Sequence, residues 1–243
     1  MTTSTALSPN SSVATPGNSD VVLDRSEILR GASILFQQGD VVEVRILRTR
    51  CGTVAGYFDD PHKMVAAIHA ADARYRPAGI YYTLNKLDAA LLGRAYNRLK
   101  EYAELATADG NIQRRRWLPI DLDPVRPGGV SSSNEEHAAA LQRAASIASD
   151  MASEWGAPIR ADSGNGAHLL YRIDLPNDQD GQRFVAGALA ELDRRYSDDV
   201  VKVDVSTANA ARIWKAYGSV ARKGDSIPGR SHRLSRILEV PLD

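Results

Sequence analysis

The chain has 243 residues, of which 43% are apolar and 25% charged, and its 30 basic and 30 acidic side chains cancel to a formal net charge of zero. This composition is typical of a globular protein, and the bulk charge does not indicate a nucleic-acid partner. The single cysteine, Cys51, excludes an internal disulfide and a cysteine-based zinc site, which fits a reducing cytoplasm. No apolar run reaches the roughly 20 residues that span a bilayer, and the N-terminus lacks a signal-peptide pattern.

The N-terminal half begins with a tail and continues with alternating strands and helices. Residues 1–22 are rich in Ser, Thr, Pro and Asn, and this composition predicts disorder. Apolar residues at helical spacing predict helices, and alternating or β-branched runs predict strands. These patterns give a helix at 24–37, strands at 41–47 and 53–58, a helix from Pro61, a strand at 78–84 and a helix at 87–99.

The next strand is predicted to end in a pair of carboxylates. The run from Arg114 to Leu122 is followed by Asp123 and then by Pro124, which stops the strand. Side chains two apart point to the same face of a strand, so Asp121 and Asp123 converge on one point. Two close carboxylates repel each other unless a cation lies between them, and Mg²⁺ or Mn²⁺ prefers such oxygen ligands. The alternative is a strand end with two solvated aspartates.

The second half continues the alternation. Ser133 and Glu136 form a capping-box pattern for a helix at 134–155, and Gly156 is suited to end it. The remaining predicted elements are strands at 158–162 and 167–173, a helix at 178–196, and strands at 200–205, 213–220 and 232–240. Helices and strands in this order predict an α+β or α/β fold with helices packed on a sheet.

A glycine-rich loop supplies a second candidate site. In the run from Ser163 through Gly164 and Asn165 to Gly166, the glycines permit a tight hairpin and a close approach of a ligand to the backbone. His168 follows at the head of a strand, where it could donate to a phosphate oxygen or act as an acid or a base. The alternative is a turn followed by a structural histidine.

A third candidate lies near the C-terminus. Asp204, flanked by valines at a strand end, is suited to reach a site shared with the aspartate pair. Asn209 and Arg212 are three residues apart and would lie on one face of a helical turn, and arginine suits a bidentate grip on phosphate. Basic residues, including Lys223, dominate the segment from Arg212 to Arg236. A solvated basic face is the alternative for this segment.

Together these residues provide three carboxylates, a histidine and several cations. That set suits two-metal phosphoryl transfer, in which metal ions assist the attacking and leaving oxygens and cations hold a triphosphate.

The motifs and their order resemble the catalytic domain of the archaeo-eukaryotic primase superfamily, in the form found on plasmids, prophages and other mobile elements. The similarity runs from about Val41 to Pro241 and includes further segments such as Tyr82–Asn85 and Gly229–Arg233. Its three central motifs are Ile120-Asp121-Leu122-Asp123, Ser163-Gly164-Asn165-Gly166-Ala167-His168 and Val203-Asp204.

The resemblance implies a primase-polymerase catalytic domain at residues 23–243. It would consist of an N-terminal α/β module at about 40–115 and a module like an RNA-recognition motif at about 116–243, with the active site between them. The implied metal ligands are Asp121, Asp123 and Asp204, and the implied nucleotide contacts are Ser163, Gly166, His168, Asn209, Arg212 and Lys223. A helicase domain or partner is also implied.

We therefore expect a template-dependent nucleotidyltransferase, namely a DNA primase that can also have DNA polymerase activity. Its partners would be a single-stranded DNA template and nucleoside triphosphates, its cofactor Mg²⁺ or Mn²⁺, and its location the cytoplasm. Two alternatives remain: a non-catalytic module that binds single-stranded nucleic acid, and a metal-dependent D-x-D glycosyltransferase. Stacking aromatic side chains would favour the binding module, and Tyr81, Tyr82 and Trp117 are the obvious candidates.

Overall fold

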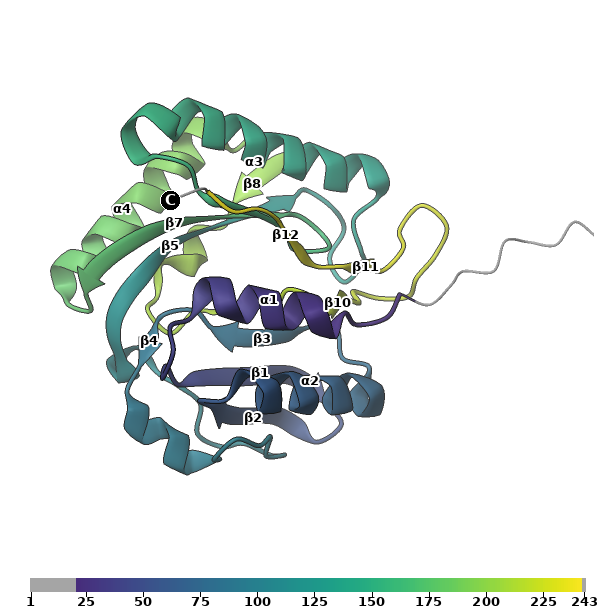
Figure 1. Cartoon of the computed structure of the whole chain (residues 1–243). Helices are drawn as coiled ribbons and strands as arrows, with labels where there is room; N and C mark the ends of the chain where they lie inside the picture. The colour runs from purple at the N-terminus through teal and green to yellow at the C-terminus, as the bar shows by residue number, and fades with distance from the viewer. Residues whose placement is uncertain (1–20, 242–243) are drawn as a thin grey trace, which may run out of the picture.

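The computed structural model describes residues 21–241, which form two large antiparallel sheets, a two-stranded sheet of β10 and β11, and four α-helices that flank them (Figure 1). The expected α+β class is confirmed. The predicted tail at residues 1–22 lies almost wholly outside the described residues. The elements are α1 (Arg25–Leu35), β1 (Val42–Thr49), β2 (Gly52–Phe58), α2 (Pro61–Tyr75), β3 (Ile80–Thr83), β4 (Lys86–Leu87), η1 (Ala89–Arg94), η2 (Asp109–Asn111), β5 (Ile112–Pro124), α3 (Asn134–Trp155), β6 (Ile159–Asp162), β7 (Ala167–Pro176), α4 (Gln179–Tyr196), β8 (Val201–Val203), η3 (Val205–Ala208), β9 (Ile213–Lys215), β10 (Val220–Ala221), β11 (Arg233–Leu234) and β12 (Arg236–Glu239).

The smaller sheet has the strand order β2-β1-β3-β9 and forms the lower part of the molecule in Figure 1. Val44, Ile46 and Ile80 are buried on one face of this sheet, in a core that they share with α1 and α2. Ile28 of α1 and Ile68 of α2 belong to the same core. They reach it because residues three and four apart line one face of a helix.

The larger sheet has the order β12-β6-β7-β5-β4, and β8 also pairs with β5. From β5 to β8 the chain follows a β-α-β-β-α-β path, with the spatial order β8-β5-β7-β6. The resemblance described above implies a module like an RNA-recognition motif in this part of the chain. The four strands bring the ends of β5, β7 and β8 together at one side of the sheet.

Helices α3 and α4 cover one face of this larger sheet (Figure 1). Leu118, Ile120 and Leu122 of β5 are completely buried beneath them. The predicted cap of α3 is present, since the Ser133 hydroxyl accepts from the Glu136 N–H and the Glu136 carboxylate accepts from the Ser133 N–H. Between residues 21 and 241, no helix is both long and apolar enough to cross a bilayer.

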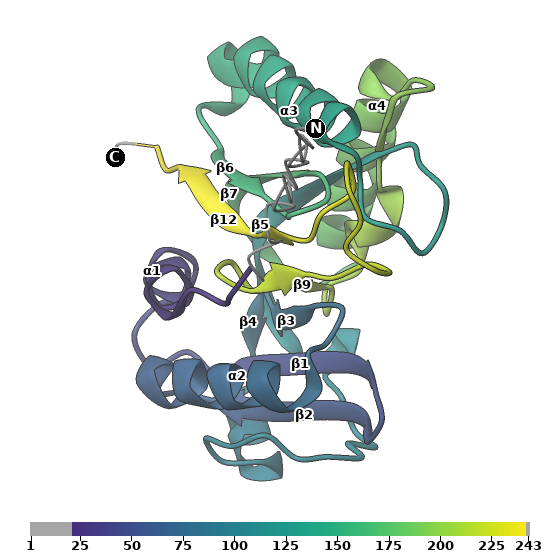
Figure 2. The same cartoon turned by 90° about the vertical axis from the view of Figure 1, so that its right-hand side faces the viewer.

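The two sheets are joined by a strand that returns late in the chain. Strand β9 follows β8, yet it pairs with β3 of the smaller sheet, and Figure 2 shows the two strands side by side. Trp117 of β5 and Leu170 of β7 extend the core of α1 and α2 onto the larger sheet. The two modules expected to divide near residue 115 are therefore not separate in sequence, because β9 lies after residue 115 but pairs within the smaller sheet.

The helix predicted at 87–99 is wrong. The segment holds only β4 and the short 3₁₀ helix η1, and Asn97 then adopts a left-handed conformation with φ of 49°. Lys100 instead exchanges backbone hydrogen bonds with Ala55 at the edge of β2, at 2.8 and 3.0 Å. Pairing with this free strand edge outweighs the helical spacing of the leucines.

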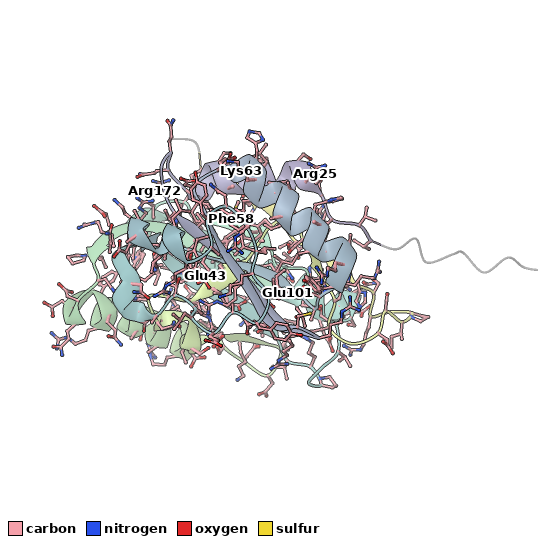
Figure 3. All side chains as sticks on the ribbon, turned by 90° about the horizontal axis from the view of Figure 1, so that it is seen from below. Arg25, Glu43, Phe58, Lys63, Glu101 and Arg172 are labelled. Atoms are coloured by element: carbon pink, nitrogen blue, oxygen red, sulfur yellow. The ribbon has the colours of Figure 1, made fainter. Side chains whose placement is uncertain are left out.

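The stretch that follows, around Thr107, is held by a buried glutamate. Glu43 is fully buried, and Figure 3 labels it near the middle of the molecule seen from below. Its carboxylate binds Arg45 at 2.6 Å and accepts from the Thr107 N–H at 3.2 Å. These contacts fix the segment on the face of the smaller sheet opposite α2.

Two strands predicted near the C-terminus are each divided in the structure. The run 213–220 breaks into β9 and β10 at Gly218, whose φ is 92°. A Cβ atom there would lie 2.5 Å from the Asp24 carbonyl oxygen, so only glycine fits. The run 232–240 breaks into β11 and β12 at Ser235, whose buried hydroxyl donates to the Ser219 carbonyl oxygen (2.8 Å).

Candidate active site

The aspartate pair lies at the end of β5 on the face opposite α3 and α4. Because side chains alternate along a strand, the burial of Ile120 and Leu122 on the helix side turns Asp121 and Asp123 to the other side. Both aspartates line a cavity of about 460 Å³ between the two sheets. The sequence prediction that the two carboxylates share one face therefore agrees with their positions in the structure.

The neighbouring strands bring two further predicted residues to the pair. His168 on β7 is the register partner of Asp121, and its Nε2 lies 3.4 Å from Asp121 Oδ1. Asp204 directly follows β8 on the other side of β5, and its backbone N–H donates to the Asp121 carbonyl oxygen at 2.9 Å. His168 and Asp204 line the same cavity. Residues more than 80 positions apart in the sequence thus meet on three adjacent strands.

The two carboxylates of β5 differ in their electrostatics. Burial would raise the pKa of Asp121, but His168, Arg212 and Lys223 outweigh it and hold that pKa below its ordinary value. For Asp123, burial and the neighbouring Asp121 raise the pKa, although Arg126 acts against them. The repulsion between the two carboxylates therefore acts mainly on Asp123, and a bound cation would reduce it.

Each of the three carboxylates has a cationic or hydrogen-bonding partner within the protein. Asp123 lies 3.3 Å from Arg126, and Asp204 lies 3.0 Å from Arg212 and also accepts from the Ser206 N–H at 2.9 Å. Within residues 21–241, no three acidic, histidine or cysteine side chains lie together at metal-binding spacing. The three carboxylates match Mg²⁺ or Mn²⁺ in donor type, because these ions prefer oxygen ligands. Holding one ion with all three would require the arginines to give up their contacts.

The glycine-rich loop contributes to the cavity through its first half. Ser163 and Asn165 line the wall, and the Asn165 carboxamide oxygen accepts from the Ser132 N–H at 2.9 Å. Gly166, a predicted nucleotide contact, does not line the cavity. A Cβ atom at Gly166 would lie only 2.2 Å from the Leu122 carbonyl oxygen, so this glycine lets β7 approach β5 closely.

The predicted cationic contacts divide in a similar way. Arg212 and Lys223 line the cavity, whereas Asn209 does not. Asn209 lies in the turn before Arg212, where its carbonyl oxygen accepts from the Arg212 N–H at 3.2 Å. The structure therefore gives Gly166 and Asn209 roles in shaping the backbone and does not place them on the cavity wall.

Much of the basic segment from Arg212 to Arg236 is used inside the protein. Arg222 is buried and binds Asp72 of α2 at 2.6 Å, and Arg230 binds Glu136 of α3 at 2.7 Å. Arg233 donates to the Ser132 carbonyl oxygen at 2.9 Å. These three arginines tie the C-terminal segment to α2 and to the N-terminal end of α3, so they do not form the continuous solvated face considered above.

Three basic cavity residues were missing from the predicted site: Arg48, Arg126 and Lys215. Tyr81, which the sequence suggests only as a stacking residue of the binding-module alternative, also lines the cavity. Lys215 is buried, and its Nζ donates to the Val220 carbonyl oxygen at 3.3 Å and lies 5.5 Å from the centre of the Tyr81 ring. Burial, together with the nearby charges of Arg222 and Lys223, lowers the pKa of Lys215 to about 7. The sequence feature that could have identified Lys215 is its position in a β-rich run, three residues after Arg212.

Comparisons with known proteins bear on the backbone alone. No family model and no curated protein matches the sequence. Two solved structures have a backbone that follows a similar path. The AEP domain of the cyanophage S-2L primase-polymerase matches with a TM-score of 0.49 and 13% identity, over 89% of this chain and 90% of that one. The polymerase domain of Mycobacterium tuberculosis Ligase D, solved in complex with DNA, matches with a TM-score of 0.44 and 14% identity, over 86% and 79%.

Proposed function

We propose that this protein is a template-dependent nucleotidyltransferase, a DNA primase that also extends primers as a DNA polymerase. One observation supports this function above the others. Asp121, Asp123 and Asp204 line a single cavity together with five basic side chains, which are Arg48, Arg126, Arg212, Lys215 and Lys223. Carboxylates that suit divalent cations, next to cations that suit phosphates, are the parts that phosphoryl transfer requires.

In the proposed reaction a 3′-hydroxyl, or the hydroxyl of the initiating nucleotide, attacks the α-phosphate of a nucleoside triphosphate, and pyrophosphate leaves. Asp121, Asp123 and Asp204 would hold Mg²⁺ or Mn²⁺. When bound, the ion supplies charge stabilisation for the attacking and leaving oxygens. Arg212 and Lys223 bind and orient the triphosphate, and their charge balances the negative charge of the pyrophosphate.

His168 and Ser163 are proposed as the remaining nucleotide contacts. Both line the cavity, and His168 lies beside Asp121 on the neighbouring strand. The histidine ring is nearly buried, so only its edge is available to a ligand in the cavity. This position suits a hydrogen bond to a phosphate oxygen next to the carboxylates.

The binding-module alternative has less support from the aromatic side chains. Of the three candidates for base stacking, Tyr82 and Trp117 are buried in the core. Tyr81 lines the cavity, but a single ring does not make a stacking platform. A D-x-D glycosyltransferase would use the carboxylates for a metal ion and a diphosphate, but it leaves the basic side chains of the C-terminal segment at the cavity, such as Lys223, unexplained.

The biological setting is part of the proposal. We place the reaction on a single-stranded DNA template during replication of a plasmid or prophage, with a helicase domain or partner that exposes the template. Only the resemblance of the motifs supports this setting.

A nucleotide-incorporation assay tests the proposed function. The purified chain is incubated with single-stranded DNA, labelled nucleotides and Mg²⁺ or Mn²⁺, with and without an annealed primer. The wild type should incorporate nucleotides, and the Asp121→Asn/Asp123→Asn variant should not. Asp199→Asn is a matched control, because Asp199 is an exposed aspartate outside the cavity. Equal incorporation by the wild type and the double variant would refute the assignment.

A further inference from the structure

A chain of three buried polar side chains connects the cavity wall to the core, since His168 and Trp214 line the cavity and Tyr217 lies behind them. The Trp214 indole N–H donates to the Tyr217 hydroxyl oxygen at 2.9 Å, and the same hydroxyl lies 2.9 Å from His168 Nδ1. The other ring nitrogen of His168, Nε2, faces Asp121 Oδ1 at 3.4 Å. The three side chains are between 0% and 4% exposed. The chain therefore leads from the core between the sheets to the first aspartate of the pair.

The hydrogen atoms in this chain can be assigned from the chemistry of the groups. An indole N–H can only donate, so the Tyr217 oxygen must accept from Trp214. A phenol has one proton, and burial raises the pKa of Tyr217 far above its ordinary value, so this proton stays on the oxygen. Among residues 21–241, the Tyr217 hydroxyl has no hydrogen-bond partner apart from Trp214 and His168. Its proton therefore points to His168 Nδ1.

The opposite assignment leaves a buried group without a partner. If His168 Nδ1 carried a proton, the Tyr217 oxygen would accept from both Trp214 and His168, and its own proton would have no acceptor. Leaving a buried donor unsatisfied costs more free energy than a typical hydrogen bond contributes. The arrangement with Nδ1 as acceptor satisfies all three side chains, and it places the ring proton of His168 on Nε2.

We infer that Tyr217, held by Trp214, is a positioning residue that fixes His168 as the tautomer with its proton on Nε2, directed at Asp121 and the cavity. The tautomer follows from the hydrogen bonds alone, and its role in nucleotide binding rests on the proposed function. Trp214 also fixes the ring plane, because its ring centre lies 4.1 Å from that of His168.

This assignment limits what His168 can do. Nδ1 accepts from Tyr217 and Nε2 already carries a proton, so the ring cannot take a proton from a substrate hydroxyl without losing the Tyr217 bond. His168 is thus a hydrogen-bond donor at Nε2, to the Asp121 carboxylate or to a phosphate oxygen, and it is not the general base of the reaction.

The first test reads the tautomer directly. The two ring nitrogens of a neutral imidazole have well-separated ¹⁵N chemical shifts that show which one carries the proton. The full chain is labelled at histidine, and the His168 signals are assigned by comparison with His168→Gln in metal-free buffer at neutral pH. We expect protonated Nε2 and unprotonated Nδ1. A proton on Nδ1, or on both nitrogens, would overturn the inference, and this spectrum requires no Tyr217 variant to fold.

The second test removes the hydroxyl. Tyr217→Phe should shift the His168 ¹⁵N signals toward those of a tautomer mixture, because only the longer contact of Nε2 with Asp121 Oδ1, at 3.4 Å, then favours a proton on Nε2. Tyr171→Phe is the matched control. Tyr171 lies on the same strand as His168, and its buried hydroxyl has no partner among the described residues. This variant should leave the His168 shifts unchanged. Wild-type shifts in Tyr217→Phe would refute the role of the hydroxyl.

The third test measures the consequence for the cavity. With Mg²⁺ and a non-hydrolysable deoxyadenosine triphosphate analogue, Tyr217→Phe should bind the analogue about tenfold more weakly than Tyr171→Phe does. Equal affinities would remove the link between the tautomer and nucleotide binding. If the wild type binds no nucleotide, the proposed function fails while the tautomer assignment still stands on the spectrum of the free protein.

Discussion

A lysine amine in the wall of the cavity makes the stability of the folded chain depend on pH. Lys215 has a pKa of about 7 in the folded state, against its ordinary 10.5. Between these values the unfolded chain binds the proton more often than the folded chain does, so stability rises with pH through this window. Below about pH 7 the cost of burying the charge is present in full. It disappears as the pH approaches 10.5.

We predict that Lys215→Met is more stable than the wild type at neutral pH, and that this advantage shrinks as the pH rises. The difference in free energy of unfolding should fall by about 1 kcal/mol per pH unit between pH 7.5 and pH 9.5. Urea unfolding of both proteins at several pH values measures it. A difference that stays constant over this range would show that the amine is not held in an unfavourable environment.

The exposed Lys223 should act on the ligand more than on the fold. If it binds the triphosphate, Lys223→Gln should raise the nucleotide concentration needed for half-maximal incorporation about tenfold, as expected for losing one charge-assisted hydrogen bond. Lys202→Gln, an exposed lysine on β8 outside the cavity, is the control. The idea fails if the two variants show the same nucleotide requirement.

Single residues could be predicted from the sequence where local periodicity decides their direction. The alternation of strand β5 was sufficient to place Asp121 and Asp123 together. Lys215 and Arg48 were missed because their positions depend on the pairing of β9 with β3 and on the β1–β2 hairpin. The pairing of β9 with β3, and the shift in the β1–β2 register between Ile46 and Thr49, are not visible in a local pattern. Likewise, the chain from Trp214 to His168 exists only once β7 and β9 are brought together.

At the scale of elements, the close approach of β5 and β7 depends on one glycine. A methyl group at Gly166 would lie 2.2 Å from the Leu122 carbonyl oxygen, so the strands would have to separate next to Asp121 and Asp123. We predict that Gly166→Ala lowers the free energy of unfolding by about 2–4 kcal/mol. It should also lower nucleotide incorporation in the fraction that remains folded.

The control for this substitution is Gly187→Ala in α4. No atom lies within 4 Å of a Cβ at Gly187, so the same change should stabilise the helix by about 1 kcal/mol. Thermal unfolding of both variants checks the pair. Equal effects on stability would contradict the contact described for Gly166.

The bounds of the helices were predicted correctly where the capping residues and the hydrophobic periodicity agreed. Helix α3 begins after Ser133 and ends before Gly156, as its capping box and C-terminal glycine indicate. The helix at 87–99 was wrong because the segment pairs with the edge of β2. The strand at 213–220 was predicted too long because its two halves belong to different sheets. In both cases a contact distant in sequence decides the structure.

At the scale of the whole molecule, buried ion pairs connect the C-terminal segment to the rest. Arg222 and Asp72 are 8% and 13% exposed at their side chains, and two hydrogen bonds of 2.6 and 3.0 Å join them. Removing one partner leaves an uncompensated buried charge. We predict that Arg222→Met lowers the free energy of unfolding by about 3 kcal/mol.

An exposed pair provides the control for this prediction. Arg183 and Asp180 of α4 form an ion pair with side chains that are 73% and 84% exposed. Arg183→Met should change stability by less than about 0.5 kcal/mol. Denaturant unfolding of the two variants distinguishes them, and similar small losses in both would mean that Arg222 is not a structural link.

The general arrangement of the molecule could be predicted from the sequence, but the strand that completes the cavity could not. The order of strands and helices predicts an α+β fold, and the path from β5 to β8 agrees with the expected module. The return of β9 to the smaller sheet was not predicted. It brings Arg212 and Lys215 to the aspartates, and so it completes a cavity that is lined by residues from Leu47 to Lys223.

The central claim is that Asp121, Asp123 and Asp204 together hold divalent cations beside a bound nucleotide, and Mn²⁺ binding tests it most directly. Free and bound Mn²⁺ are counted by electron paramagnetic resonance with a non-hydrolysable deoxyadenosine triphosphate analogue present. We predict that the wild type and Asp199→Asn bind Mn²⁺ beyond the amount held by the nucleotide alone. In Asp204→Asn and Asp121→Asn/Asp123→Asn this excess should be lost. An excess that persists in those two variants, or that is absent from the wild type, would contradict the account.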